Sequence, residues 1–186
     1  GAIEVYAKAP NKSRTLINLD LSGLGGGQVV SDQRFDGSTG YVIDSFNGNR
    51  EMTGGQLDAL RNSLFPTPLL AYRENGFQVA LAGRDTVGTG DAHVLVLTPA
   101  AGPIVKLFID ASTFMLVKTA VTLDVPQLGG DIEQVVQFSD FRDVDGIKVP
   151  YAILSTNPAQ TIRATMSEVR HNQDIDDSSF SRPPGQ

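Results

Sequence analysis

The chain has 186 residues and a mass of 19.9 kDa, which suits one domain with its own hydrophobic core. It contains no cysteine, so disulfides, thiolate metal sites and a cysteine nucleophile are excluded. Lys and Arg number 15 against 21 Asp and Glu, a net charge of −6. The sequence lacks the basic stripe of nucleic-acid-binding proteins, so we expect no nucleic-acid partner. The 19 glycines, 10 prolines and absence of tryptophan favour many short strands joined by turns.

The two ends of the sequence read as a truncated start and a loosely held tail. No run approaches the ~20 apolar residues of a membrane-spanning helix, so we expect no membrane span. Gly1–Val5 lacks the basic and apolar regions of a signal peptide. Because Gly1 precedes what reads as mid-strand sequence, we expect a single domain over 1–186 that is truncated at its N-terminus. We expect a signal, anchor or upstream domain to be missing. The polar stretch 174–186 predicts a loosely ordered tail.

The first part of the chain alternates between apolar and polar residues. This period of two predicts four strands: Ala2–Ala9, Ser13–Leu21, Gln28–Phe35 and Tyr41–Asp44. The segment Asp36–Gly40 is a strong turn signal between the last two. Gly23–Gly27 loosely resembles a phosphate-binding loop, but no helix follows it, so we interpret it as a flexible hairpin loop.

The period then changes to that of a helix. Thr53 is a candidate N-cap, and Leu57, Leu60 and Leu64 follow at i, i+3 and i+7, which places them on one helix face. Pro66 ends the pattern. We expect this to be the one substantial helix of the chain.

From Gly76 onward the pattern predicts a meander of strands joined by short turns. The candidate strands are Phe77–Val87, Ala92–Thr98, Ile104–Asp110, Phe114–Asp124, Asp131–Val144, Ile147–Thr156 and Thr161–His171. Consecutive strands with short connections run antiparallel. About ten or eleven strands with one helix predict a mainly β, α+β protein. A sheet this large curls, so we expect a strongly curved, unclosed half-barrel.

The late strands each have one apolar face and one polar face. Met115, Val117 and Val121, for example, lie opposite Lys118 and Ala120 in the alternation. One helix with three leucines is a small cover for so much apolar strand surface. Either the sheet closes on itself or an apolar concavity is available to a ligand.

Metal-binding patterns are weak. Asp143–Gly146 resembles the start of a calcium loop, but the later ligands are missing, and a hairpin turn is favoured. Asp174, Asp176 and Asp177 could gather a hard cation, although clustered acids near an end are usually solvated. We expect no metal and no cofactor.

Catalytic patterns are weak too. His93 and His171 are the two histidines, and neither belongs to a paired metal-ligand motif. A Ser-His-Asp triad is assembled by the fold and leaves no fixed spacing in the sequence, so a hydrolase stays an alternative. The chain has no Gly-x-Ser-x-Gly elbow. We expect no enzymatic activity and no catalytic residues.

Several stretches together form a family pattern over roughly residues 35–180. They are Phe35–Gly37, Gly83–Val87, Asp91–Leu95, Lys106–Thr113, Phe141–Tyr151 and Ile175–Phe180. The most specific parts are the strand that runs into Ile109–Thr113 and the segment Phe-Arg-Asp-Val-Asp-Gly-Ile-Lys-Val-Pro. This pattern resembles the outer-membrane lipoprotein-sorting superfamily, the LolA/LolB-like domains.

The resemblance implies an unclosed antiparallel barrel plugged by helices, in a periplasmic or cell-envelope setting. It also implies an apolar concave face that holds acyl chains, and neither enzyme activity nor cofactor. The chain departs from the family in having less helix near its start, and no residue of it can be matched to the family's partner contacts. The fold therefore carries over more safely than the shuttling of lipoproteins.

On this basis we expect an acyl chain of a lipid or lipoprotein to bind the apolar concave face. The candidate lining is Met115, Val117, Val121, Val136, Phe138, Tyr151, Ile162 and Met166, and the candidate cover is Leu57, Leu60 and Leu64. The alternative for each residue is an ordinary filled core. The alternative for the whole chain is a non-catalytic accessory or protein-interaction domain of a larger exported envelope protein.

Overall fold

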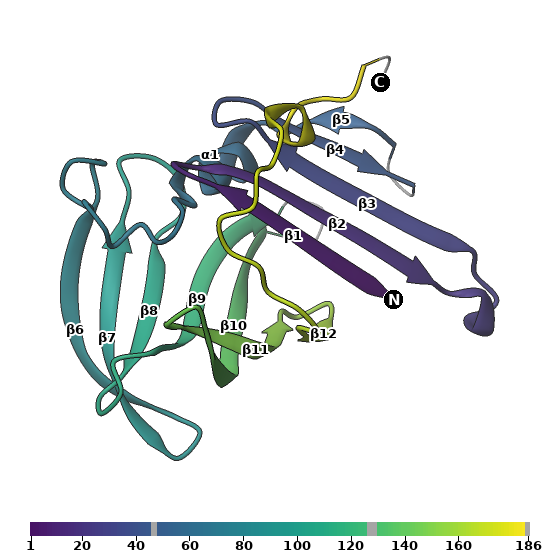
Figure 1. Ribbon diagram of the computed structural model, residues 1–186. Helices are drawn as coiled ribbons and strands as arrows, with labels where there is room; N and C mark the ends of the chain where they lie inside the picture. Colours follow the sequence, from purple (N-terminus) through teal and green to yellow (C-terminus); the bar gives the residue numbers. More distant parts are fainter. Residues whose placement is uncertain (46–47, 126–129, 185–186) are drawn as a thin grey trace. The chain divides into compact units, whose positions relative to one another are not determined.

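The computed structural model describes residues 1–45, 48–125 and 130–184. These divide into two compact units, each built around an antiparallel sheet (Figure 1). Unit 1 comprises Gly1–Ala71 with Asp174–Gln186, and unit 2 comprises Tyr72–Gln173. Residues 126–129, which belong to the connection predicted between Asp124 and Asp131, and the last two residues of the predicted tail lie outside the described residues.

Unit 1 contains a five-stranded sheet in simple chain order. Its strands are β1 (Ala2–Lys8), β2 (Lys12–Asp20), β3 (Gln28–Phe35), β4 (Gly40–Asp44) and β5 (Arg50–Glu51). The first four were predicted within two residues at each end. β5 was not predicted, because two residues are too short to show an alternation. Between β2 and β3 the glycine-rich segment forms the 3-10 turn η1 (Ser22–Leu24), which confirms a loop there.

One face of this sheet is packed by the helix α1 (Gly54–Asn62). Gly40 lies so close to Met52 and Leu60 that a Cβ at this position would stand 3.0 Å from the Met52 side chain. Phe35, which pairs with Gly40, is fully buried. The helix begins where it was predicted, but the Thr53 side chain makes no capping hydrogen bond. Gly54 enters the helix with a φ of +57°, which is not helical.

The opposite face of the same sheet is crossed by the C-terminal segment Asp174–Arg182. Lys8 and Lys12 of the sheet donate hydrogen bonds to Asp177, at 2.8 and 2.6 Å. The short turn η3 (Asp177–Phe180) places Phe180 almost completely out of contact with solvent. The polar composition of this segment predicts a loosely ordered tail. Composition alone does not take account of a single aromatic side chain that anchors the segment.

Unit 2 contains a seven-stranded sheet, again in chain order. Its strands are β6 (Gln78–Val87), β7 (Gly90–Thr98), β8 (Val105–Asp110), β9 (Leu116–Val125), β10 (Gly130–Val144), β11 (Ile147–Thr156) and β12 (Thr161–Thr165). β12 is shorter than predicted. Val169 is the one apolar side chain between Ser167 and His171, which offers too little apolar surface to extend the strand.

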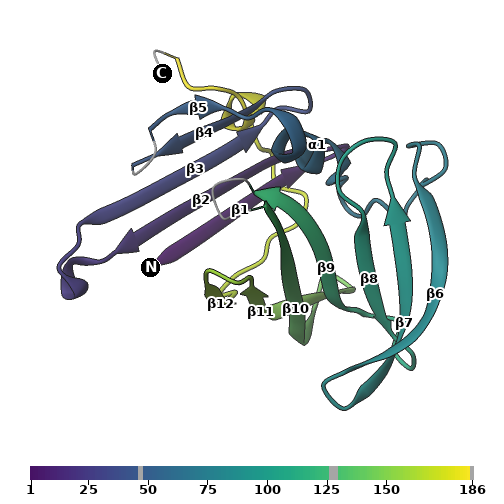
Figure 2. The same cartoon turned by 180° about the vertical axis from the view of Figure 1, so that it is seen from behind.

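The seven-stranded sheet is strongly curved, and it is open between β6 and β12 (Figures 1 and 2). In a flat sheet its edge strands would lie about 29 Å apart. Instead, Val87 and Gly88 at the end of β6 line the same surface depression as Arg163 and Thr165 of β12. A mainly β fold with a strongly curved, unclosed antiparallel sheet was predicted, and it is confirmed. The described residues carry twelve strands in two sheets rather than ten or eleven in one.

Candidate functional site

The register of the seven-stranded sheet aligns a row of mostly apolar side chains across all seven strands. Residues that pair directly in antiparallel strands project from the same face. From β6 to β12 the paired residues are Leu81, Leu95, Leu107, Thr119, Val136, Ser155 and Ile162. A second row on this face consists of Val79, Leu97, Val105 and Val121. We call the face that carries these two rows the leucine face.

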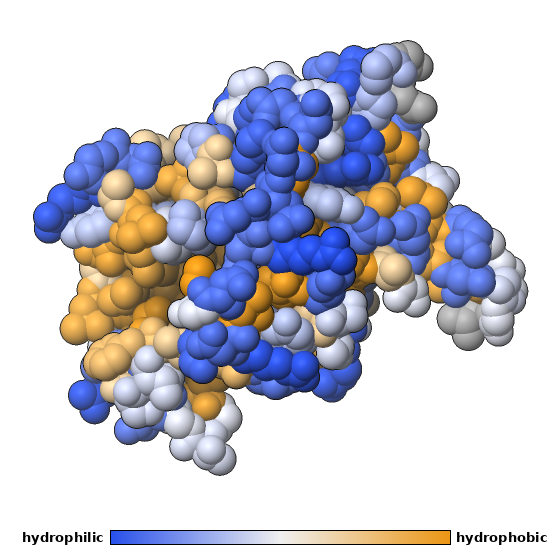
Figure 3. All heavy atoms as spheres, viewed as in Figure 1, coloured by the Kyte–Doolittle hydropathy of each residue, from blue (hydrophilic) through white to orange (hydrophobic). Residues whose placement is uncertain are grey.

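Burial along the first row is graded. Leu107 in the inner strand β8 is 6% exposed, whereas Leu81 and Ile162 at the two edges are 66% and 39% exposed. Figure 3 shows apolar residues gathered over β6, β7 and β8. The leucine face therefore exposes apolar side chains at both edges of the sheet. In an ordinary filled core these side chains would be covered.

The opposite face of the sheet has a different chemistry. Its centre is a small packed cluster of Ala92, Val94, Phe108 and Ala120, all buried. The ammonium group of Lys118 lies 4.1 Å from the centre of the Phe108 ring and covers it by a cation–π contact. The centre of this face is therefore covered by its own side chains.

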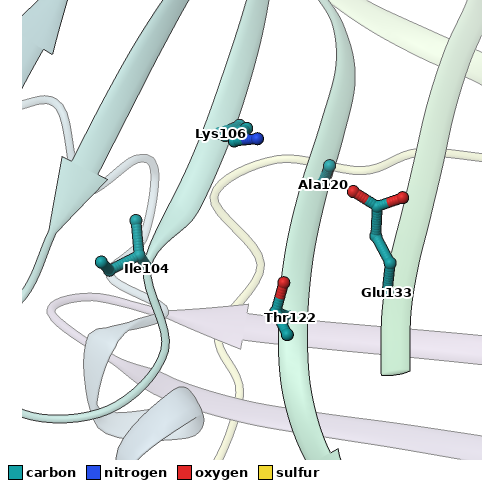
Figure 4. A pocket seen from close by; sticks show the side chains of 5 residues that line it. All are labelled: Ile104, Lys106, Ala120, Thr122 and Glu133. Atoms are coloured by element: carbon teal, nitrogen blue, oxygen red, sulfur yellow. The ribbon is translucent and has the colours of Figure 1, made fainter. Parts of the chain in front are cut away.

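A shallow depression of about 330 Å³ on the same face is lined by polar groups (Figure 4). Lys106 of β8 and Glu133 of β10 lie on either side of Ala120 and Thr122 of β9, and Ile104 completes the lining. A lysine and a glutamate on the two strands that flank β9 suit water or small polar groups. We therefore do not regard this depression as a site for an acyl chain.

A second depression, of about 460 Å³, lies across β9 to β12. It brings together Val117 and Phe138 of the predicted lining with Leu154, and Gln137 and Arg163 add polar groups. Its volume falls within the usual range for small-molecule sites. The lining is mixed, with apolar contacts from the strand interiors and one guanidinium from the edge strand.

The structure places most of the predicted lining residues on the leucine face. Val121, Val136 and Ile162 belong to the two rows. Phe138 and Tyr151 lie on the same side by alternation, because Phe138 follows Val136 by two residues and Tyr151 precedes the Phe138 partner, Ile153, by two. Their part in holding a ligand stays a prediction.

The other predicted residues lie elsewhere. Val117 packs against the buried cluster of the opposite face, next to an irregularity in the β8–β9 register. Met115 precedes β9, and its carbonyl accepts a hydrogen bond from the Asp110 amide. Met166 follows β12 and bonds through its amide to the Tyr151 carbonyl.

The predicted cover belongs to unit 1. Leu57 and Leu60 lie in α1, and Leu64 follows that helix. Leu60 approaches Gly40 of the five-stranded sheet. A covering role for the three leucines over the other sheet stays a prediction.

The leucines of this face, Leu81, Leu95, Leu97 and Leu107, are not among the predicted lining residues. The signal was available, because each lies in a predicted strand. It was missed because β6 carries small residues around Leu81, which hides the alternation, and because the pairing of Leu81 with Leu95 depends on a β-bulge between Leu81 and Gly83. A bulge shifts the register by one residue and leaves no mark in the sequence.

The metal-binding candidates form no assembled site in the described part of the chain. Within those residues no group of three His, Asp or Glu side chains is placed to hold a metal ion. Asp143–Gly146 forms the predicted hairpin turn, in which the Asp143 carboxylate accepts a hydrogen bond from the Gly146 amide at 2.9 Å. His171 meets the Asp145 carboxylate at 3.2 Å, on the exposed rim of the β10–β11 turn.

The sequence matches no protein-family model and no curated protein. Its fold resembles solved structures. A LolA superfamily protein from Nitrosomonas europaea superposes with a TM-score of 0.58 at 15% identity, over 97% of this chain and 80% of that one. A domain from Vibrio parahaemolyticus described as an outer membrane lipoprotein-sorting protein gives a TM-score of 0.50 at 13% identity, over 91% and 81%.

The chain has a LolA-like fold. The resemblance deduced from the sequence motifs is thereby confirmed at the level of the fold. Identities this low carry no residue roles from one protein to another. Among the described residues, no helix is both long and apolar enough to cross a membrane.

Proposed function

We propose that this LolA-like chain binds the acyl chain of a lipid or lipoprotein on the leucine face, in the periplasm or cell envelope, and catalyses no reaction. The observation that carries the proposal is the row from Leu81 to Ile162, which crosses the whole sheet and is exposed at both edges. The two solved structures with a related fold support it, because one is described as a lipoprotein-sorting domain. On the opposite face, the central apolar residues Ala92, Val94, Phe108 and Ala120 are buried.

The energetics permit such binding where the surface is already formed. Burying about 15 methylene groups at about 0.8 kcal/mol each yields about 12 kcal/mol. Association costs on the order of 4–15 kcal/mol in lost freedom and side-chain ordering. Micromolar binding therefore requires a surface that is already formed. A row fixed by strand pairing meets that requirement, because its side chains are held in register by the backbone.

Two exposed members of the row can be substituted to test the proposal. Leu81→Asp and Ile162→Asp place a charge where an acyl chain would lie, and both positions are exposed enough for the fold to tolerate it. We expect each variant to weaken uptake of a fluorescent fatty acid at least about tenfold. The matched control is Phe114→Asp, because Phe114 is 70% exposed in the β8–β9 turn, outside the rows.

Thermal unfolding of all three variants accompanies the titration. Loss of uptake in the two row variants, with unchanged melting and normal uptake in Phe114→Asp, supports acyl-chain binding on the leucine face. Equal uptake by all four proteins contradicts that location. Wild-type protein that takes up no fatty acid contradicts the ligand and favours the alternative, an accessory or protein-interaction domain of a larger envelope protein.

A further inference from the structure

We infer that the acyl ligand of the leucine face carries an anionic head group, a carboxylate or a phosphate, and that Arg84 holds it, beside His93, on the β6–β7 strand pair. This inference rests on the proposed function, because it names the ligand class of the same face. The juxtaposition that carries it lies within unit 2, where two apolar residue pairs are followed by an Arg–His pair along the same two strands.

A β-bulge brings Arg84 onto the leucine face. In a regular strand the side chains alternate, so Gly83 would follow Leu81 on this face and Arg84 would project from the opposite one. Instead, the register shifts between Leu81 and Gly83, and Arg84 then pairs with His93. His93 lies on the leucine face because it precedes Leu95 by two residues. Bulges are common next to functional sites, where they re-aim a side chain, and this one determines which face a guanidinium occupies.

Along β6 and β7 the leucine face changes from apolar to polar. The successive pairs on this face are Val79–Leu97, Leu81–Leu95 and Arg84–His93. Leu97 and His93 are four residues apart in β7, a distance of about 13 Å along a strand. An extended decanoate chain has a similar length. A ligand whose chain lies over the two apolar pairs therefore places its head group at Arg84 and His93.

The Arg84 guanidinium is available to such a head group. Arg84 is exposed, and it forms no hydrogen bond or ion pair with any residue that the structure describes. A guanidinium presents its N–H donors in a planar fork that matches a carboxylate or a phosphate. His93 is half-buried, and a ring N–H of an imidazole can donate one more hydrogen bond.

The neighbouring charged groups leave this role to Arg84. The next pair toward the β6–β7 turn, Thr86–Asp91, adds a carboxylate on this face, but within the described residues no ion pair joins it to Arg84. Arg142 of the same sheet is already engaged. Its guanidinium donates to Asp140 at 2.7 Å and lies 4.3 Å from the centre of the Tyr151 ring. Of these two arginines, only Arg84 can bind an anion without giving up a partner.

Equilibrium dialysis with three radiolabelled probes of equal chain length tests the inference at neutral pH and low salt. The probes are decanoate, decyl phosphate and the uncharged decanol. Arg84→Gln should weaken the binding of both anions about fivefold, because the ion pair forms at an exposed position, and should leave decanol binding unchanged. Arg84→Lys should keep most of the anion affinity. In the wild type, raising the salt concentration should weaken only the two anions.

The matched control is Arg163→Gln, which removes the same charge from the other edge strand, β12. Arg163 is also exposed and also lacks a hydrogen bond or ion pair among the described residues. It follows Ile162 in the alternation and therefore projects from the opposite face. This variant should bind all three probes like the wild type. Thermal unfolding of each variant shows whether a loss of binding is a loss of folded protein.

The outcomes separate the head group from the chain. Tighter binding of decanoate indicates a fatty acid, and tighter binding of decyl phosphate indicates a phospholipid; each supports an anionic head group at Arg84 if Arg84→Gln removes it. Anion binding that is unchanged in Arg84→Gln, or equally weakened in Arg163→Gln, overturns the inference, while decanol binding by the wild type keeps the proposed function. A wild-type protein that binds none of the probes overturns both.

Discussion

At the scale of single residues, two hairpin turns use the same four-residue device. Asp36 begins the turn between β3 and β4, and Asp110 begins the turn between β8 and β9, each followed by a Ser and a Thr at the third and fourth positions. In both turns the aspartate accepts hydrogen bonds from two backbone amides and two hydroxyls. One turn lies in each unit, so the device positions a strand pair in both sheets.

These hydrogen bonds lower the pKa of both carboxyl groups. For Asp36, partial burial acts to raise the pKa, but the bonds from Thr39 and Ser38 outweigh it and lower the pKa to about 2. For Asp110, the bonds from Thr113 and Ser112 lower the pKa further. Each carboxylate therefore stabilises the folded state above the pKa of an unfolded Asp, about 3.9, and that stabilisation is lost as the pH falls below this value.

We predict that Asp36→Ala lowers the free energy of unfolding by about 1 kcal/mol at neutral pH, because the turn loses its acceptor and the group is largely exposed. The difference from wild type should shrink between pH 4 and pH 2. Urea titrations at several pH values measure both effects. Asp36→Asn should keep part of the stability and lose the pH dependence. A constant difference from pH 7 to pH 2 would contradict this account of the turn.

Substitution of the buried Asp32 should lower the free energy of unfolding more than substitution of Asp36. Burial acts to raise its pKa, whereas the bonds from Arg14 and Arg34 lower it, and the net direction is downward. We predict that Asp32→Ala lowers the free energy of unfolding by about 3 kcal/mol, since it leaves two half-buried guanidinium groups without their partner. Chemical denaturation measures the change. A loss no larger than that of an exposed ion pair, such as the one broken by Asp58→Ala, would show that water replaces the carboxylate.

At the scale of elements, the β10–β11 hairpin shows how a local sequence determines a long strand pair. Asp145 and Gly146 have φ values of +53° and +80°. Two consecutive residues with positive φ form the turn that matches the twist of a tight hairpin. Nothing lies within 4 Å of a Cβ built at Gly146, so a side chain there meets only backbone strain.

We predict that Gly146→Ala lowers the free energy of unfolding by about 1 kcal/mol through this strain alone. The matched control is Gly55→Ala in α1, which also meets open space but needs no positive φ. That substitution should raise stability by about 0.4–1 kcal/mol, since it restricts the unfolded chain. Thermal unfolding compares the two. Equal effects of the same sign would rule out backbone conformation as the cause.

Most elements were predictable because their signals are local. Alternation identified eleven strands, and the leucine spacing identified α1. The elements that failed depend on partners outside the segment. β5 exists only because Arg50 and Glu51 pair with β4, and β12 pairs with β11 only as far as Thr165.

At the scale of the whole molecule, the sequence predicted the fold better than it predicted the site. The motifs around Ile109–Thr113 and Phe141–Pro150 correctly indicated a LolA-like fold. The division into two sheets was not visible, because both sheets share one antiparallel pattern. The apolar rows could be predicted within a strand, as with Val136 and Phe138, but the row across strands needs the register, which the bulge beside Leu81 alters.

The central claim is that the leucine face carries an acyl chain. Native mass spectrometry of protein exported to a bacterial periplasm, with organic extraction of the same sample, tests it most directly. We predict a bound mass that disappears on extraction and appears in the organic phase as a lipid, and that is absent from the double variant Leu81→Asp/Ile162→Asp. A wild-type protein that carries no such mass and takes up no fluorescent fatty acid would contradict the claim.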